Sequence, residues 1–112
     1  MSGADYTDKV LMTAAKQEGD VVIHGEVDSV YANLATPDLQ IQYGDKSGIV
    51  LHRNGLKDVV VWNPWTEKAA GMADFGNDEF HRMICVEAGQ VAEFLALAAG
   101  DSWQGSQVLS LL

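Results

Sequence analysis

The stretch that indicates the fold class most clearly is LQIQYGDKSGIVLH, residues 39–52. Its first five residues alternate apolar and polar side chains, the period-two pattern of a half-buried β-strand. Residues 44–48 have the composition of a turn, and residues 49–52 resume an apolar, β-branched run. The stretch therefore predicts a β-hairpin with a five-residue loop.

Similar short runs extend this β pattern in both directions. The sequence predicts β segments at residues 21–24, 27–34, 59–62, 83–87, 93–97 and 106–111. Residues 92–99 could also be helical on propensity, but turn signals on both sides favour a strand. Short connections imply a meander in which successive strands pair antiparallel. Residues 66–70 are the exception, since they predict one or two helical turns with Thr66 as the N-cap.

Length and charge limit the classes of protein that this chain can belong to. The 112 residues make one domain, and 16 acidic against 7 basic residues give a net charge of -9. Such a surface repels phosphate backbones and anionic membranes, so neither nucleic acid nor a membrane is expected as a partner. The start of the chain lacks the features of a secretory signal, and the single Cys85 cannot form an internal disulfide. We expect a cytoplasmic location.

Glu87 is the first candidate for chemistry. It follows the apolar run of residues 83–86 and precedes Ala88-Gly89, which places it at the end of a predicted strand. A carboxylate there is expected to be partly desolvated, which suits it to general-base work. The alternative is an ordinary charged residue that faces water where a strand meets its loop.

Asp28 is the second candidate, because a carboxylate inside a strand can accept hydrogen bonds from sugar hydroxyls. It competes with Glu26, which has the same parity along the strand, and with a purely solvent-facing role. Trp62 and Trp65 flank Asn63-Pro64, where the predicted strand ends. Indoles beside a loop can stack on sugar rings, but more commonly they fill a core or cover a sheet edge. The three histidines are scattered without metal-ligand spacing, and no phosphate-binding glycine-rich loop is present, so no metal or cofactor is expected.

Several segments in order resemble the hexose-6-phosphate mutarotases, also called glucose-6-phosphate 1-epimerases. They are Tyr6-Thr7-Asp8-Lys9, the Glu26-Val27-Asp28 segment, Trp62-Asn63-Pro64-Trp65, Cys85-Val86-Glu87 and the tail from Gly100 to Gln107. The resemblance covers nearly the whole chain. It implies an all-β fold, an antiparallel β-sandwich that forms part of a galactose-mutarotase-like supersandwich.

The resemblance also implies an activity, the interconversion of the α and β anomers of a hexose 6-phosphate. Glu87 matches the family's general base, which takes the proton of the anomeric hydroxyl, and Asp28 matches the aspartate that holds sugar hydroxyls. A histidine acts as the general acid on the ring oxygen in the family.

This chain departs from the family in length, since family members are about two and a half times longer and it resembles their last portion. The catalytic histidine and most phosphate-binding arginines belong to the part that precedes it. We therefore expect a chain that is inactive alone and whose exposed sheet is covered by self-association or by the missing N-terminal region. The alternative function is a non-catalytic carbohydrate-binding or protein-interaction β-sandwich.

Overall fold

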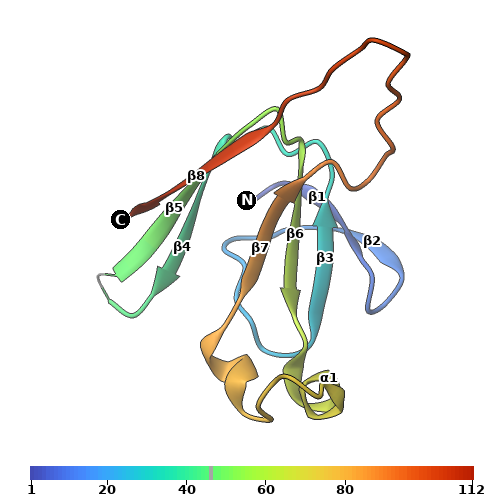
Figure 1. Cartoon of the computed structure of the whole chain (residues 1–112). Helices are drawn as coiled ribbons and strands as arrows, with labels where there is room; N and C mark the ends of the chain where they lie inside the picture. The colour runs from blue at the N-terminus through green and yellow to red at the C-terminus, as the bar shows by residue number, and fades with distance from the viewer. Residues whose placement is uncertain (46) are drawn as a thin grey trace.

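Two antiparallel sheets form the molecule over residues 1–45 and 47–112, which the computed structural model describes (Figure 1). The larger sheet has the strand order β2-β1-β3-β6-β7, and the smaller sheet has the order β4-β5-β8. The elements are β1 (Asp5–Asp8), β2 (Thr13–Lys16), β3 (Val27–Tyr31), β4 (Asp38–Tyr43), β5 (Ser47–Asn54), β6 (Asp58–Asn63), α1 (Trp65–Gly71), η1 (Glu79–Arg82), β7 (Cys85–Gly89) and β8 (Ser106–Leu111). The predicted all-β sandwich with one short helix is confirmed.

The hairpin predicted from residues 39–52 is present as β4 and β5. Its ladder runs from Asp38 opposite His52 to Tyr43 opposite Ser47. The pairing continues further toward the turn than predicted, which shortens the loop. Lys46, in the middle of that predicted loop, lies outside the described residues.

The predicted antiparallel pairing is confirmed, and the successive strands β1–β2, β4–β5 and β6–β7 do pair. A continuous meander is not formed, because the chain changes sheet after β3, after β5 and after β7. β3 pairs with β6 across residues 27–31 and 59–63, while β5 pairs with β4 and β8. The chain leaves β5 through Gly55, whose φ of 72° is the left-handed conformation that glycine adopts without strain. Each sheet has one apolar face. The connections that pass from one sheet to the other, between β3 and β4, β5 and β6, and β7 and β8, allow these two apolar faces to pack against each other.

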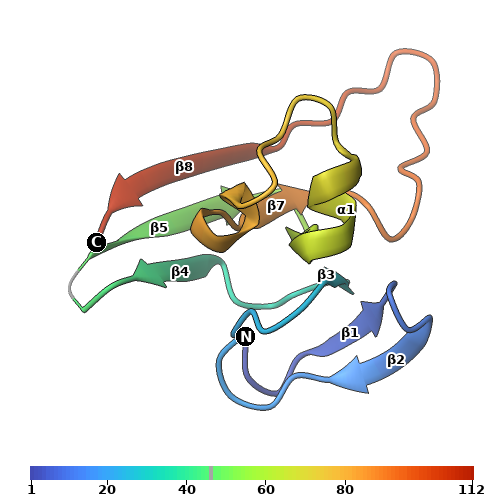
Figure 2. The same ribbon diagram turned by 90° about the horizontal axis from the view of Figure 1, so that it is seen from below.

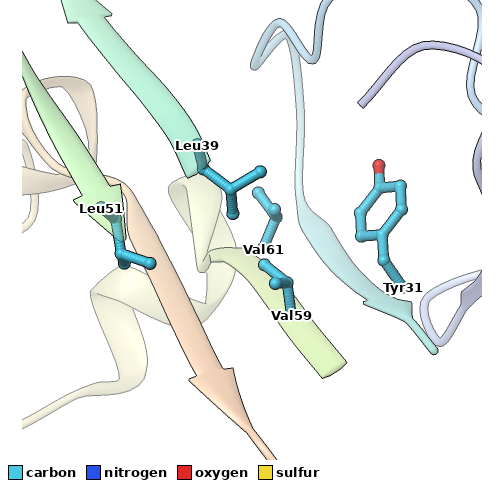
Figure 3. Packing of buried hydrophobic residues seen from close by; sticks show 5 residues of the cluster. All are labelled: Tyr31, Leu39, Leu51, Val59 and Val61. Atoms are coloured by element: carbon cyan, nitrogen blue, oxygen red, sulfur yellow. The ribbon is translucent and has the colours of Figure 1, made fainter. Parts of the chain in front are cut away.

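The core lies between the two sheets. Tyr31, Val59 and Val61 of the larger sheet and Leu39 and Leu51 of the smaller sheet are all at most 4% exposed. Figure 3 shows the two leucines pointing across the interface toward the two valines. Burying such side chains contributes roughly 1.5–3 kcal/mol each, so this cluster is the main force that holds the sheets together.

Asn63 organises the segment between β6 and β7. Its side-chain Oδ1 accepts the backbone N–H of Trp65 at 2.9 Å, and its Nδ2 donates to the backbone oxygens of Phe80 and Met83 at 2.9 and 3.0 Å. The helix begins at Trp65 after Pro64 as N-cap, without a side-chain cap bond. The prediction of Thr66 as N-cap is therefore wrong, since Asn63 binds the first amide of the helix instead.

Two predicted β segments lie outside the sheets. Residues 21–24 form a connection, and residues 93–97 lie in the long passage from β7 to β8, neither strand nor helix. That passage must cross from one sheet to the other, and Phe94 in it is fully exposed. By contrast, the β1–β2 hairpin was not predicted, because its residues lack apolar alternation.

Two buried charged residues fasten the crossings between the sheets. The Arg53 guanidinium donates to the carbonyl oxygens of Leu34 and Thr36 in the β3–β4 crossing and of Leu56 and Lys57 in the β5–β6 crossing. The Asp58 carboxylate accepts the backbone N–H groups of Asn33 in the first crossing and of Val91 and Ala92 in the β7–β8 crossing. Together, the two side chains contact all three passages.

Candidate active site

The open face of the larger sheet carries both carboxylates singled out in the sequence. Strand register places Asp28 opposite Trp62 and Trp62 opposite Cys85, while Val60 lies opposite Glu87. Directly opposed residues share a face, and so do residues two apart along a strand. Asp28, Trp62 and Glu87 therefore share the face that points away from the core.

Asp28 and Glu87 stand on opposite sides of Trp62. They are separated by the full width of β6 and offset by two residues along the strands. Strand and residue spacings put their Cα atoms roughly 12 Å apart.

Glu87 lies in the middle of β7 and is exposed, rather than at a strand end in a desolvated position as predicted. The reason is that β7 begins two residues later than predicted and continues through Gly89. Its neighbour on the same face, Cys85, is partly buried. Burial and the nearby Glu87 charge raise the pKa of the Cys85 thiol, so it stays protonated at neutral pH.

Asp28 is half-buried and lies near a cation. Lys9 Nζ is 3.8 Å from Asp28 Oδ2, and the carboxylate is 22% exposed. Glu26, its rival in the sequence, is paired with Lys68 of α1. The hydrogen bond to Glu26, with the charges of Glu26 and Asp28, raises the pKa of Lys68. Asp28 lies directly opposite Trp62, whereas Glu26 precedes β3, so Asp28 is the better placed of the two carboxylates for a ligand above Trp62.

Lys9 and Lys68 were missed as neighbours of this face in the sequence. Lys9 follows β1, which pairs with β3 through Thr7 opposite Val30. Its backbone N–H donates to Asp28 O at 2.8 Å. The Tyr6-Thr7-Asp8-Lys9 segment was noticed only for its resemblance, and nothing in its pattern predicted the pairing of β1 with β3.

The two tryptophans have different surroundings. Trp62 is half-buried on the open face between Asp28 and Cys85. Trp65 instead packs its ring against Phe80 and His81, with ring centroids 5.0 and 5.9 Å apart. Trp62 is thus placed to contact a ligand on the open face, whereas Trp65 covers η1.

The histidines lie apart from the carboxylates. His52 belongs to the smaller sheet, where its Nδ1 pairs with Asp38 Oδ1. His81 lies in η1 with its ring 4.0 Å from that of Phe80, centroid to centroid, and His24 is exposed in the connection before β3. In residues 1–45 and 47–112, no three His, Cys, Asp or Glu side chains are grouped to hold a metal ion.

The two sheets, seen from below in Figure 2, meet through the core residues, and Asp28, Trp62 and Glu87 lie on the opposite face of the larger sheet. The described part of the chain contains no helix long and apolar enough to cross a membrane. These features define a β-sandwich whose open sheet face presents two carboxylates around an indole. Such a set of groups suits a small polyhydroxylated ligand.

Comparison with known proteins identifies the family. The aldose 1-epimerase family model matches residues 2–110, so the chain belongs to that family. A Cenchrus ciliaris protein named "Putative glucose-6-phosphate 1-epimerase" is 40% identical over 95 residues, which cover 84% of this chain and 29% of that protein. A Haemophilus influenzae protein of the same name is 33% identical over 76 residues, covering 65% of this chain and 26% of that protein. The chain thus spans less than a third of the length of these curated relatives.

Proposed function

We propose that the open face of β3, β6 and β7 is the sugar-binding floor of a hexose 6-phosphate mutarotase site. The observation that carries this proposal is the strand register, which brings Asp28, Trp62 and Glu87 onto one face although they are far apart in the sequence. Membership in the aldose 1-epimerase family and the names of the two relatives support a sugar as the ligand.

In this proposal Glu87 is the general base. Its carboxylate takes the proton of the anomeric hydroxyl while a general acid protonates the ring oxygen, and the bond between the anomeric carbon and the ring oxygen breaks. The open-chain aldehyde turns its other face, and the ring closes with the proton transfers reversed. Glu87 is exposed on β7, so a hydroxyl can reach it from solvent.

Asp28 and Trp62 orient the sugar. The Asp28 carboxylate accepts hydrogen bonds from ring hydroxyls, and the Trp62 indole contacts the apolar face of the ring. Lys9 Nζ lies 3.8 Å from Asp28 Oδ2 and places a positive charge beside this carboxylate. The acid is expected to come from outside the chain, since His52 and His81 are held elsewhere in the described structure.

Rapid polarimetry with α-glucose 6-phosphate tests this proposal. We expect negligible activity from the chain alone, because losing one partner of an acid–base pair costs at least about a hundredfold in rate. Imidazole added as an external acid should give an acceleration above its own background that Glu87→Gln abolishes. The exposed Glu67→Gln is the matched control.

Two outcomes would contradict the proposal. Activity without imidazole that disappears in Glu87→Gln would place the acid within this chain. Rates that are the same for the native chain and Glu87→Gln under both conditions would remove Glu87 as the base and favour the alternative, a non-catalytic carbohydrate-binding module.

A further inference from the structure

Lys9 lies at the end of the row of side chains that crosses the open face of the larger sheet. β1 pairs with β3 through two residue pairs, and the same register continued by one residue places Lys9 opposite Asp28. The backbone N–H of Lys9 donates to Asp28 O at 2.8 Å. Asp8 Oδ1 accepts the backbone N–H groups of Val10 and Leu11, both at 2.9 Å. The turn that follows β1 therefore holds Lys9 beside Asp28.

The ion pair between Lys9 and Asp28 is not closed by a hydrogen bond. Lys9 Nζ lies 3.8 Å from Asp28 Oδ2, whereas a hydrogen bond between an ammonium and a carboxylate spans about 2.7–2.9 Å. The Lys16–Asp5 pair on the same sheet is closed, with Lys16 Nζ 2.8 Å from Asp5 Oδ1. The Lys9 ammonium thus keeps donors for an acceptor other than Asp28.

The Asp28 carboxylate lacks hydrogen-bond donors in the described part of the chain. Its side chain is 22% exposed, and no group in residues 1–45 and 47–112 donates a hydrogen bond to its oxygens. Removing a carboxylate from water costs free energy unless other donors replace the lost water. The Lys9 side chain beside it is 53% exposed, so a ligand on the open face can reach both charged groups.

We propose that Lys9 is a second sugar-contacting residue, which together with Asp28 binds two neighbouring hydroxyls of a hexose ring above Trp62. This inference rests on the proposed function of the open face as a sugar-binding floor. A hydroxyl both donates and accepts hydrogen bonds. One ring hydroxyl donates to the Asp28 carboxylate, and its neighbour accepts a hydrogen bond from the Lys9 ammonium. The separation of the two charges leaves each of them available to one hydroxyl.

The position of Glu87 assigns the two hydroxyls. Glu87 lies on the other side of Trp62 from Asp28, and in the proposed function it takes the proton of the anomeric hydroxyl. Lys9 and Asp28 therefore contact the part of the ring remote from the anomeric carbon, which carries the 3- and 4-hydroxyls. A sugar that lacks either hydroxyl leaves one charged group without its hydrogen bond, which makes Lys9 a specificity-determining residue.

Titrations followed by saturation-transfer NMR test this assignment, with glucose 6-phosphate and its 2-, 3- and 4-deoxy analogues as ligands. The native chain should bind the 3- and 4-deoxy analogues about tenfold more weakly than glucose 6-phosphate, and the 2-deoxy analogue with nearly the same affinity. Lys9→Met should bind glucose 6-phosphate about tenfold more weakly. It should also lose its discrimination against one of the two analogues, because the partner of that hydroxyl is gone.

Lys16→Met is the matched control, since it removes the same charge from the same sheet at a lysine that is already paired. It should leave every affinity unchanged. Unphosphorylated glucose separates a hydroxyl contact from a phosphate contact. Lys9→Met should weaken the binding of glucose by the same factor as that of glucose 6-phosphate.

Three results would overturn the assignment. An equal loss for glucose 6-phosphate and all its deoxy analogues would give Lys9 a structural role alone. A loss confined to phosphorylated sugars would place the phosphate at Lys9. Unchanged binding in Lys9→Met, with weaker binding in Asp28→Asn and Glu87→Gln, would remove Lys9 and leave the proposed function intact. A native chain that does not bind glucose 6-phosphate at all would contradict the proposed function itself, and the role of Lys9 with it.

Discussion

Asp28 and Glu87 lie on one face of the larger sheet, on the two strands that flank β6, with Trp62 of β6 directly opposite Asp28. The pairing of β3, β6 and β7 thus brings together side chains from residues 28, 62 and 87, which are far apart in the sequence. This arrangement depends on the connections between the strands, which the side chains of Arg53 and Asp58 hold by hydrogen bonds.

Asp58 stabilises the chain in a pH-dependent way. Burial alone would raise the pKa of this carboxyl, but hydrogen bonds from the backbone N–H groups of Ala92, Asn33 and Val91 lower it below its usual value. A lowered folded pKa means that the contribution is complete above the unfolded value of about 4 and is lost as the pH falls through the folded value.

Asp58→Asn should therefore lower the free energy of unfolding at pH 7 by about 1–3 kcal/mol, since an amide accepts these N–H groups with only one oxygen. Urea denaturation at a series of pH values measures the effect. The loss should shrink below pH 4, and a loss that stays constant into acid would show that the Asp58 charge is not responsible. The exposed Asp74→Asn should change nothing at any pH.

The planar guanidinium of Arg53 binds both the β3–β4 and the β5–β6 connection. Burial lowers the pKa of its guanidinium, which nonetheless remains charged and donates to four carbonyl oxygens. A lysine offers a single ammonium and cannot reach both crossings. We expect Arg53→Lys to cost about 2 kcal/mol or more in urea denaturation.

Arg82→Lys is the matched control for this substitution, since Arg82 is exposed in η1 and should lose less than about 0.5 kcal/mol. Equal losses in the two variants would contradict the role given to Arg53.

Substitution of Asn63 should destabilise the chain, whether its side-chain amide is removed or replaced by a carboxylate. It is 1% exposed, and its Nδ2 donates to two backbone oxygens while its Oδ1 accepts the Trp65 amide. Asn63→Ala should destabilise the chain by about 2–3 kcal/mol in thermal or urea unfolding, because buried groups lose their partners. Asn63→Asp should cost more, since a carboxylate would face two carbonyl oxygens. A smaller loss in the aspartate variant than in the alanine variant would contradict this hydrogen-bond assignment.

The sequence predicted the local elements better than their pairing. The alternation in residues 39–43 and the apolar run of β6 were sufficient to place those strands, since burial on one or both faces determines such patterns. β8 was also predicted, although all of its residues are exposed. The crossings were not predictable in this way. They depend on Arg53 and Asp58, whose partners lie 3 to 34 residues away in the sequence and leave no periodic signal.

At the candidate site, too, the sequence predicted individual residues better than their spatial relationship. Asp28 and Glu87 were selected from the sequence, by strand position and by resemblance, but a shared face requires the β3–β6–β7 register, which a meander would not give. The prediction of a desolvated Glu87 failed because a five-residue strand was displaced by two residues. Lys9 was missed because its contact with Asp28 depends on the pairing of the unpredicted β1 with β3.

The central claim is that the face shared by Asp28, Trp62 and Glu87 binds a sugar phosphate. Saturation-transfer NMR with glucose 6-phosphate tests it most directly, with Asp28→Asn, Glu87→Gln and the control Asp5→Asn, which alters an exposed carboxylate on the same face in β1. We predict transfer to the sugar ring protons in the native chain and in Asp5→Asn. Each of the other two variants should weaken binding by about tenfold or more, because a charged hydrogen-bond acceptor is lost. Binding that is the same in all four proteins would place the sugar elsewhere and contradict the account.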